Sequence, residues 1–174
     1  MINYIEKGGK LHETINAAGY YLEPNTNDKA YDANGNQSAE IDAAVQAIID
    51  NYDPLPVAKK DALALVKAAS AKKRLKFVTQ AAGKDAEYIF KAQEAAQFGI
   101  DTSIGVYMQA RMDETSETAA QVASAWNASA ASWKAAGAHI AAIEDKASAQ
   151  INALTDWKQC ETVANAFVAE LEAM

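Results

Sequence analysis

The chain has 174 residues, half of them apolar, a net charge of −7, and alanine as its commonest residue. This acidic balance argues against a general nucleic-acid binder, which is normally basic, and the single cysteine, Cys160, excludes an internal disulfide. The N-terminus has no basic segment followed by an apolar run, and no window approaches a membrane-spanning length, so we expect neither a signal peptide nor a membrane span. The alanine content favours closely packed helices, since alanine costs no side-chain entropy in a helix.

Residues 1–37 differ in pattern from the remainder of the chain. Ile2 and Tyr4 alternate with polar neighbours, and Gly8-Gly9 then interrupts the run. This arrangement predicts a short strand followed by a turn. Such an arm would suit docking onto a neighbouring subunit, with strand addition to a sheet edge as the mode of recognition.

A two-turn helix is predicted over residues 11–18, and an extended segment is predicted at Tyr20-Tyr21-Leu22. The polar stretch EPNTNDKAYDANGNQ that follows is rich in turn-forming residues and predicts an exposed loop or linker. We therefore expect two parts, an N-terminal arm or docking segment over 1–37 and an alanine-rich helical bundle over 38–174.

Helical periodicity begins at Ser38, which can cap a helix whose apolar positions recur at spacings of three and four. The segment DPLP at 53–56 ends this helix and starts a second over about 57–79, because proline is tolerated in the first turn of a helix but not in its interior. Gly83 permits a turn into a third helix, and a short fourth helix is predicted over 106–112.

The longest periodic segment is 117–154, with a cap expected at Ser116. Its apolar residues recur at alternating spacings of four and three, as in a coiled coil or an antiparallel bundle. Thr155-Asp156 predicts a new helix start, so a shorter final helix should return along the long one as an αα-hairpin. The predicted fold class is all-α, a helical bundle with a long antiparallel αα-hairpin and a small N-terminal strand or arm segment. The residues expected in the helix-packing core are Val122, Trp126, Trp133, Ile140, Ile143, Trp157 and Phe167.

Residues suited to catalysis or metal binding are few and scattered. His12 and His139 lie in different segments, and the sequence contains neither HExxH nor CxxC. Trp126 and Trp133, one heptad apart, are expected to pack against a neighbouring helix rather than to hold a ligand. Cys160 falls on the apolar stripe of the last helix and is expected to be a small buried hydrophobe. We expect no enzymatic activity, no catalytic residue, no metal and no cofactor.

The helix over 57–76 concentrates positive charge. One interpretation is a contact to a polyanion such as DNA, or to an acidic partner. The simpler interpretation, which we favour, is a solvated face that complements the acidic residues 113–117, Glu144 and Asp145 within the same bundle. Aromatic residues are nearly absent from this segment apart from Phe77, so stacking on nucleobases has no support.

Three segments in a fixed order resemble a helical module of tailed-bacteriophage tail and tail-fibre-associated proteins. They are NYDPLP, RLKFVTQAAGKDAEYIFKAQEA and TAAQVASAWNASAASWKAAGAHIAAIEDKASAQINAL. In that module a helix ends at an aromatic-Val/Ile-Thr turn containing Ala-Gly, and a helix of pattern Tyr-x-x-Lys-x-x-Glu-Ala follows. The resemblance covers residues 40–155, and the matching positions of the closing helix are Thr118, Val122, Trp133, Ile140 and Ile143.

The resemblance implies a virion structural protein, a tail, tail-fibre or baseplate-type component made in the host cytoplasm, which acts by protein–protein packing. It implies other virion proteins as partners, in a homo-oligomer or beside a ring or fibre neighbour. The hydropathy of the chain predicts no membrane contact, and its acidic charge argues against nucleic acid as a partner. The alternative is a tail-fibre assembly chaperone absent from the mature particle, and a weaker one is a nucleic-acid or DNA-mimic regulator. The residues expected to engage the partner are Ile2, Tyr4, Tyr20, Tyr21 and Leu22.

Overall fold

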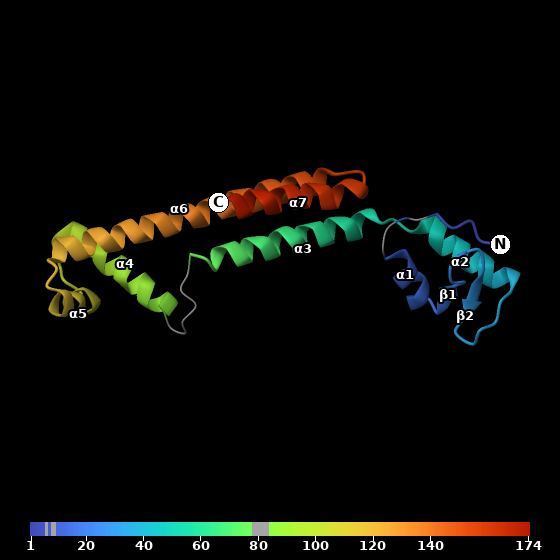
Figure 1. Ribbon diagram of the computed structural model, residues 1–174, viewed down its shortest axis with the longest axis horizontal. Coiled ribbons are helices and arrows are strands. Elements are labelled where there is room, and N and C mark those ends of the chain that lie inside the picture. Colours follow the sequence, from blue (N-terminus) through green and yellow to red (C-terminus); the bar gives the residue numbers. More distant parts are fainter. Residues whose placement is uncertain (6, 8–9, 78–83) are drawn as a thin grey trace. The chain divides into compact units, whose positions relative to one another are not determined.

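The computed structural model describes residues 1–5, 7, 10–77 and 84–174 (Figure 1). These residues form seven helices and one two-stranded antiparallel sheet, which confirms the expected mainly helical class with a small strand segment. They divide into two compact units, the first made of Met1–Leu65 and Ala149–Asn165 and the second of Val66–Ser148 and Ala166–Met174. The turns predicted at Gly8-Gly9 and Gly83 lie outside the described residues.

The first unit begins with α1 (Leu11–Ala17), β1 (Tyr20–Leu22), β2 (Ala30–Asp32) and α2 (Ala39–Asn51). The strands pair antiparallel in a register that sets Tyr21 opposite Tyr31. β2 lies within the stretch that the sequence predicts as a loop. The sequence does not reveal this strand, because three residues between turn formers are too few to show a period of two. Ile2, predicted in a strand, lies outside any strand, although its N–H donates to the Asp28 carbonyl at 2.8 Å.

These elements share one hydrophobic core that continues beyond residue 37, where the sequence places the end of an arm. Val45 and Ile49 of α2 are fully buried in the same cluster as Leu11 and Ile15 of α1. The apolar face of α2 is covered by the elements that precede it, so the first 37 residues and α2 fold together. The buried members of this N-terminal core are Ile2, Leu11, Ile15, Leu22, Ala30, Val45 and Ile49.

Polar side chains set the helix starts that the sequence indicates around residues 38 and 53. The Ser38 hydroxyl accepts from the Ile41 N–H at 3.3 Å, which confirms the predicted cap of α2. The Asp53 carboxylate accepts from the Leu55 N–H at 2.9 Å where α3 (Leu55–Arg74) begins. α3 ends about five residues earlier than predicted, at a turn over residues 75–77.

In the second unit, α4 (Lys84–Asp101) and α5 (Val106–Thr115) pack on the start of the long helix α6. Ala95, Met108, Val122 and Ala123 are the buried residues of this contact. Glu94 of α4 caps α5, because its two carboxylate oxygens accept from the N–H groups of Tyr107 at 3.2 Å and Met108 at 2.8 Å. This cap holds the two short helices together.

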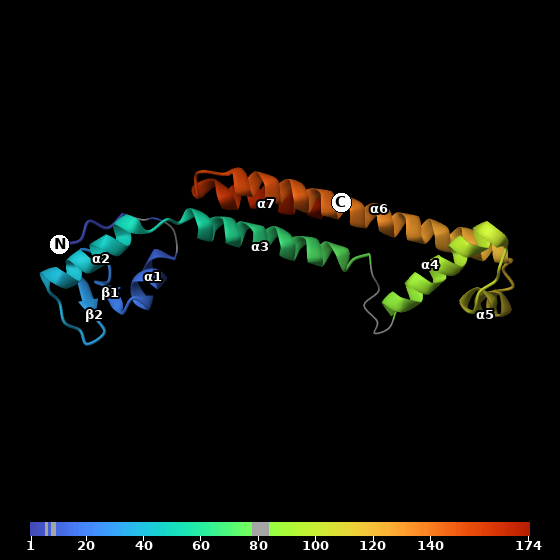
Figure 2. The same ribbon diagram turned by 180° about the vertical axis from the view of Figure 1, so that it is seen from behind.

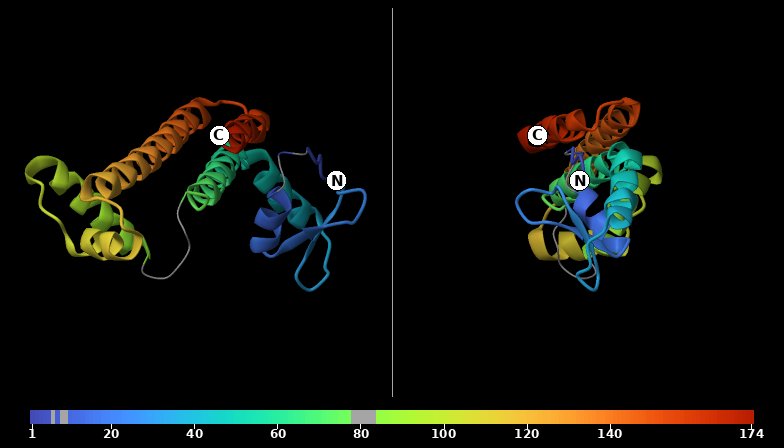
Figure 3. Two further views of the ribbon diagram at one scale, coloured as in Figure 1. Left: turned by 60° about the vertical axis from the view of Figure 1, so that its left-hand side comes forward. Right: turned by 90° about the vertical axis from the view of Figure 1, so that its right-hand side faces the viewer.

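The long helix is α6 (Ala119–Ala153), and α7 (Lys158–Ala173) returns beside it, which confirms the predicted αα-hairpin (Figures 2 and 3). Asp156 accepts from the Lys158 N–H at 3.0 Å at the start of α7, as predicted. The cap of α6 is Thr118 and not Ser116. Thr118 exchanges hydrogen bonds with Gln121, whereas Ser116 ends α5 in a left-handed conformation with φ of 59°.

Candidate interaction surfaces

The residues expected to engage a partner from an N-terminal arm lie largely in the chain's own core. Ile2 and Leu22 are buried, and Tyr4 and Tyr20 pack against the same cluster. Tyr21 is the exposed member, and its ring stacks on Tyr31 at a centroid distance of 5.3 Å. The arm is therefore part of a folded unit, because α1, the sheet and α2 together bury its apolar side chains.

The outer edge of β2 has its amide groups occupied within the chain. The Ala30 N–H donates to the Asp42 carboxylate at 3.0 Å, and the Asp32 N–H donates to the Asn36 carbonyl at 3.0 Å. Both amides point away from β1, because Glu23 and Lys29 form the neighbouring hydrogen-bonded pair of the ladder. A partner strand added at this edge would have to displace both hydrogen bonds. The structure therefore does not support β2 as a docking edge.

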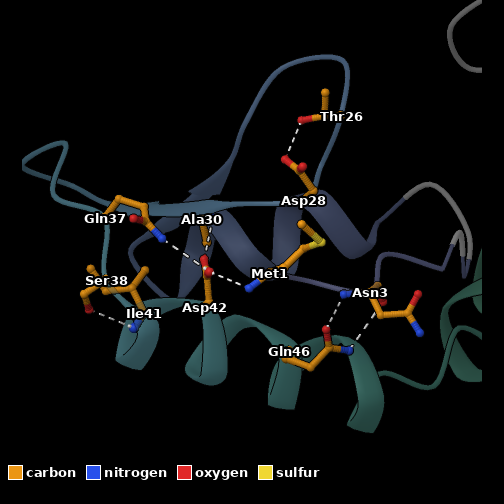
Figure 4. Close-up of polar contacts among 10 residues, drawn as sticks. All are labelled: Met1, Asn3, Thr26, Asp28, Ala30, Gln37, Ser38, Ile41, Asp42 and Gln46. Atoms are coloured by element: carbon orange, nitrogen blue, oxygen red, sulfur yellow. Dashed lines mark hydrogen bonds and ion pairs between the residues drawn. The ribbon is translucent and has the colours of Figure 1, made fainter.

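Asp42 joins three segments of the N-terminal core (Figure 4). Its carboxylate accepts from the Ala30 N–H, from the Met1 amino group at 3.0 Å and from the Gln37 amide at 3.3 Å. The Ala30 N–H, followed by the Met1 and Gln37 donors, holds the pKa of Asp42 below its usual value against the opposing effect of burial. The sequence offers no signal for this role, since Asp42 looks like an ordinary acidic residue in the first turn of a helix.

The expected helix-packing core is present along most of its length but is interrupted at its middle. Val122, Ile140, Ile143 and Phe167 are buried, and Trp126 and Trp157 are half-buried. Trp133 is different, because 52 % of its surface remains exposed. Heptad spacing identified the apolar face of α6, but it did not indicate where a neighbour covers that face.

Trp133 lies beside an open groove in the second unit. Two adjoining hollows of about 420 and 310 Å³ both include Phe77 and Trp133. One hollow extends over small residues of α6, and the other extends toward the end of α3. Their remaining lining residues are Arg74, Ala128, Ser129, Ser132, Lys134, Gly137, Ala138 and Ile140.

A second exposed apolar surface lies on α4 and α5. Phe90 and Tyr107 stack nearly parallel with their ring centroids 6.1 Å apart. Ile100 and Val106, at the connection between the two helices, are 79 % and 81 % exposed. Several large apolar side chains are thus left in water on two short helices.

Some of the cationic side chains of α3 form contacts within the chain. Arg74 forms an ion pair with Glu144 and lowers the pKa of that carboxyl. This contact confirms the expected complement to Glu144. The acidic stretch 113–117 is also expected to complement α3, but its Glu117 forms an ion pair with Arg111 of α5 at 2.7 Å. Lys73 is buried and donates to the Glu172 carbonyl at 3.4 Å.

The remaining polar candidates are separate from one another. Cys160 is buried as expected, and burial raises the pKa of its thiol. His12 and His139 are both exposed, and the His12 ring lies 5.4 Å from the ring of Tyr4. In the part of the chain that the structure describes, no three His, Cys, Asp or Glu side chains gather as metal ligands. No helix among the described residues has the length and apolar character needed to cross a membrane.

Comparisons with known proteins give no match, neither to a family model nor to a curated protein nor to a solved structure. The resemblance to phage tail modules therefore remains a prediction from the sequence. The groove beside Trp133 and the exposed apolar surface of α4 and α5 are the described surfaces suited to contact another protein.

Proposed function

We propose that this chain is a structural component of a bacteriophage virion, of tail, tail-fibre or baseplate type, and that it acts by protein–protein packing. Its partners would be other virion proteins, as a homo-oligomer or as a ring or fibre neighbour, after synthesis in the host cytoplasm. The module-like order of segments over residues 40–155 supports the phage assignment. The exposed apolar surface of α4 and α5 supports the packing role and is the observation on which that role depends.

This surface suits an assembly contact because its exposed side chains are large, and two of them, Phe90 and Tyr107, stack on each other. Val106 and Ile100 are almost fully exposed, and Ile89 and Phe90 are about half exposed. Fully burying a side chain of this kind is worth about 1.5–3 kcal/mol. Apolar patches rimmed by polar residues commonly mark interaction sites on soluble proteins, so a neighbouring protein would cover this patch in an assembled particle.

The first test is the copy number of the protein in purified particles, measured by quantitative mass spectrometry. A reproducible copy number compatible with particle symmetry is the expected result. If the protein is absent from particles but associates with fibre proteins in the infected-cell lysate, the assembly-chaperone alternative holds. If it associates with neither, the phage assignment is wrong.

A matched pair of variants tests whether the α4–α5 surface is used. Val106→Glu adds a charge to the apolar surface, and Gln93→Glu adds the same charge at an exposed polar position of α4. Neither residue is buried, so both variants should fold as the parent does. We expect the copy number to fall strongly for Val106→Glu and to stay unchanged for Gln93→Glu.

A further inference from the structure

The middle of α6 is an uncovered helix face within the second unit. Among the described residues 124–139, none is buried, whereas Ala123 is buried before this stretch and Ile140 after it. The stretch consists mostly of alanine and other small residues, and Trp133 is half exposed near its centre. At the start of this stretch Trp126 still packs against the contact with α4 and α5, and the Asn127 side-chain amide donates to the Ala95 carbonyl at 3.2 Å. α6 is therefore open from residue 128 to residue 139.

The uncovered face has the form of a groove and not of a closed pocket. Ser129, Trp133 and Gly137 follow one another at spacings of four along one side of α6, and all three line the hollows described above. Phe77 forms the opposite wall. A groove that follows a helix face in this way suits a second helix, which would pack its own side chains between those of α6.

Gly137 leaves room for another backbone to approach α6 from outside. A glycine in a helix interior destabilises the helix relative to alanine. A Cβ built at Gly137 would meet no described atom within 4 Å, so the chain's own packing does not require glycine there. Glycine is useful where another backbone must come close, and Gly137 lies on the floor of the open groove.

The charge around the groove identifies the kind of partner. No aspartate or glutamate occurs from 118 through 143 or from 62 through 77, although the whole chain has a net charge of −7. Lys134 lines the groove, and Arg74 lines it as well but is paired with Glu144. The side chains of Lys72 and Lys76 are exposed near the end of α3. If a second copy of the chain packed its own groove against this one, cations would face cations, which is unfavourable. An acidic partner would complement it.

We propose that this groove binds an acidic amphipathic helix of a partner protein, with small residues facing Gly137 and carboxylates on its flanks. The open stretch of α6, residues 128–139, is roughly 18 Å long at 1.5 Å per residue, which corresponds to a partner helix of about 12 residues. This proposal rests on the packing role proposed above and adds the chemistry of the partner to it.

The test uses the full chain and a dye-labelled amidated peptide of about 18 residues. The peptide has alanine and leucine on one face and glutamate on its flanks, and a second peptide has every glutamate replaced by lysine. Fluorescence anisotropy at low salt should give a dissociation constant about tenfold lower for the glutamate peptide, despite the negative net charge of the protein. Added salt should weaken this binding.

Matched variants connect the binding to the groove. Trp133→Ala and Gly137→Leu should each raise the dissociation constant about tenfold, since one removes the central aromatic contact and the other fills the space for the partner backbone. Gly137→Ala should raise the melting temperature of the free protein, which separates folding from binding. Lys134→Glu should weaken binding, whereas Lys60→Glu, the same charge change at an exposed position of the first unit, should not.

Three results would overturn the proposal. One is equal or tighter binding of the lysine peptide, and another is unchanged binding by the folded Gly137→Leu variant. The third is a free protein that sediments as a dimer and becomes monomeric with Trp133→Ala, which would make a second copy the occupant of the groove. The peptide assay involves no particles, so its failure leaves the copy-number test unaffected, and absence from particles leaves the groove assay equally valid.

Discussion

Asp42 shows how a single side chain can hold together segments that are distant in the sequence. Its carboxylate joins the N-terminal amino group, β2 and the segment before α2, and its residue is only 8 % exposed. A buried acceptor with several donors contributes more than a surface ion pair, because its removal leaves those donors unsatisfied. At this scale the N-terminal core depends on one acidic residue.

We expect Asp42→Asn to destabilise the N-terminal core by about 2 kcal/mol at pH 7. The folded-state pKa of Asp42 lies below its unfolded value, so the stabilisation is fully present above about pH 4 and is lost as the pH falls through the folded-state pKa. Amide hydrogen exchange of α2 measured at pH 7 and at pH 3 would show the difference between parent and variant shrinking in acid. The exposed control, Asp50→Asn, should change exchange little at either pH, and an equal effect of both variants would contradict the role assigned to Asp42.

Gly105 shows a glycine that is required by a neighbour and not by its own backbone angles. Its φ of −82° is accessible to any residue, but a Cβ there would lie 2.1 Å from the Glu94 carboxyl carbon. Gly105→Ala should therefore displace Glu94 from the start of α5 and cost about 1–2 kcal/mol of local stability. Hydrogen exchange of α5 would measure this loss.

Gly99 is the matched control for that substitution. It lies inside α4, and a Cβ there would meet no described atom within 4 Å. Gly99→Ala should stabilise α4 by about 1 kcal/mol. The two glycine substitutions should thus have opposite signs, and the same sign for both would show that the Glu94 cap is not what Gly105 protects.

At the scale of single helices, local side-chain contacts decide where each helix begins. Thr118 and Gln121 satisfy each other's backbone amides at the start of α6, and Lys7 donates to the carbonyls of Ile49 and Asp50 at the end of α2. These contacts supply partners for the groups that every helix leaves unpaired at its ends. They stabilise the helix ends but do not determine how the helices pack against one another.

Thr118→Ala should destabilise the first turns of α6 by about 1 kcal/mol, because the hydroxyl that accepts from Gln121 is removed. Ser116→Ala, two residues earlier, is the control and should change stability by less than about 0.5 kcal/mol. Thermal unfolding followed by circular dichroism would measure both. A larger effect at Ser116 would restore the cap position that the sequence pattern favoured.

At the scale of the whole molecule, the N-terminal core extends beyond residue 37 into α2. Because Val45 and Ile49 of α2 are buried with Leu11 and Ile15, a deletion at residue 37 cuts through a folded unit. From the sequence alone, removal of residues 1–37 would be expected to leave a folded helical bundle. The structure predicts instead that α2 loses its partners when those residues are removed.

Two truncations distinguish these expectations. Deletion of residues 1–37 should leave α2 unprotected in hydrogen exchange and expose its apolar face to aggregation. Deletion of residues 1–52 removes the whole cluster and should give a monodisperse protein that keeps the helicity of α3 to α7. If α2 stays protected after the shorter deletion, the boundary near residue 37 is the correct one.

The sequence alone determined the helical class, the return of α7 along α6, and the starts of α2 and α7, because periodicity, capping residues and proline act within a few residues of chain. It also identified the apolar seam that contains Trp133. Only the tertiary structure decided what covers each apolar face: α1 and the sheet cover α2, α4 and α5 cover the start of α6, and residues 128–139 stay open. The physical reason is that hydrophobic burial is non-directional, so a pattern shows that a face is apolar but not which surface removes it from water.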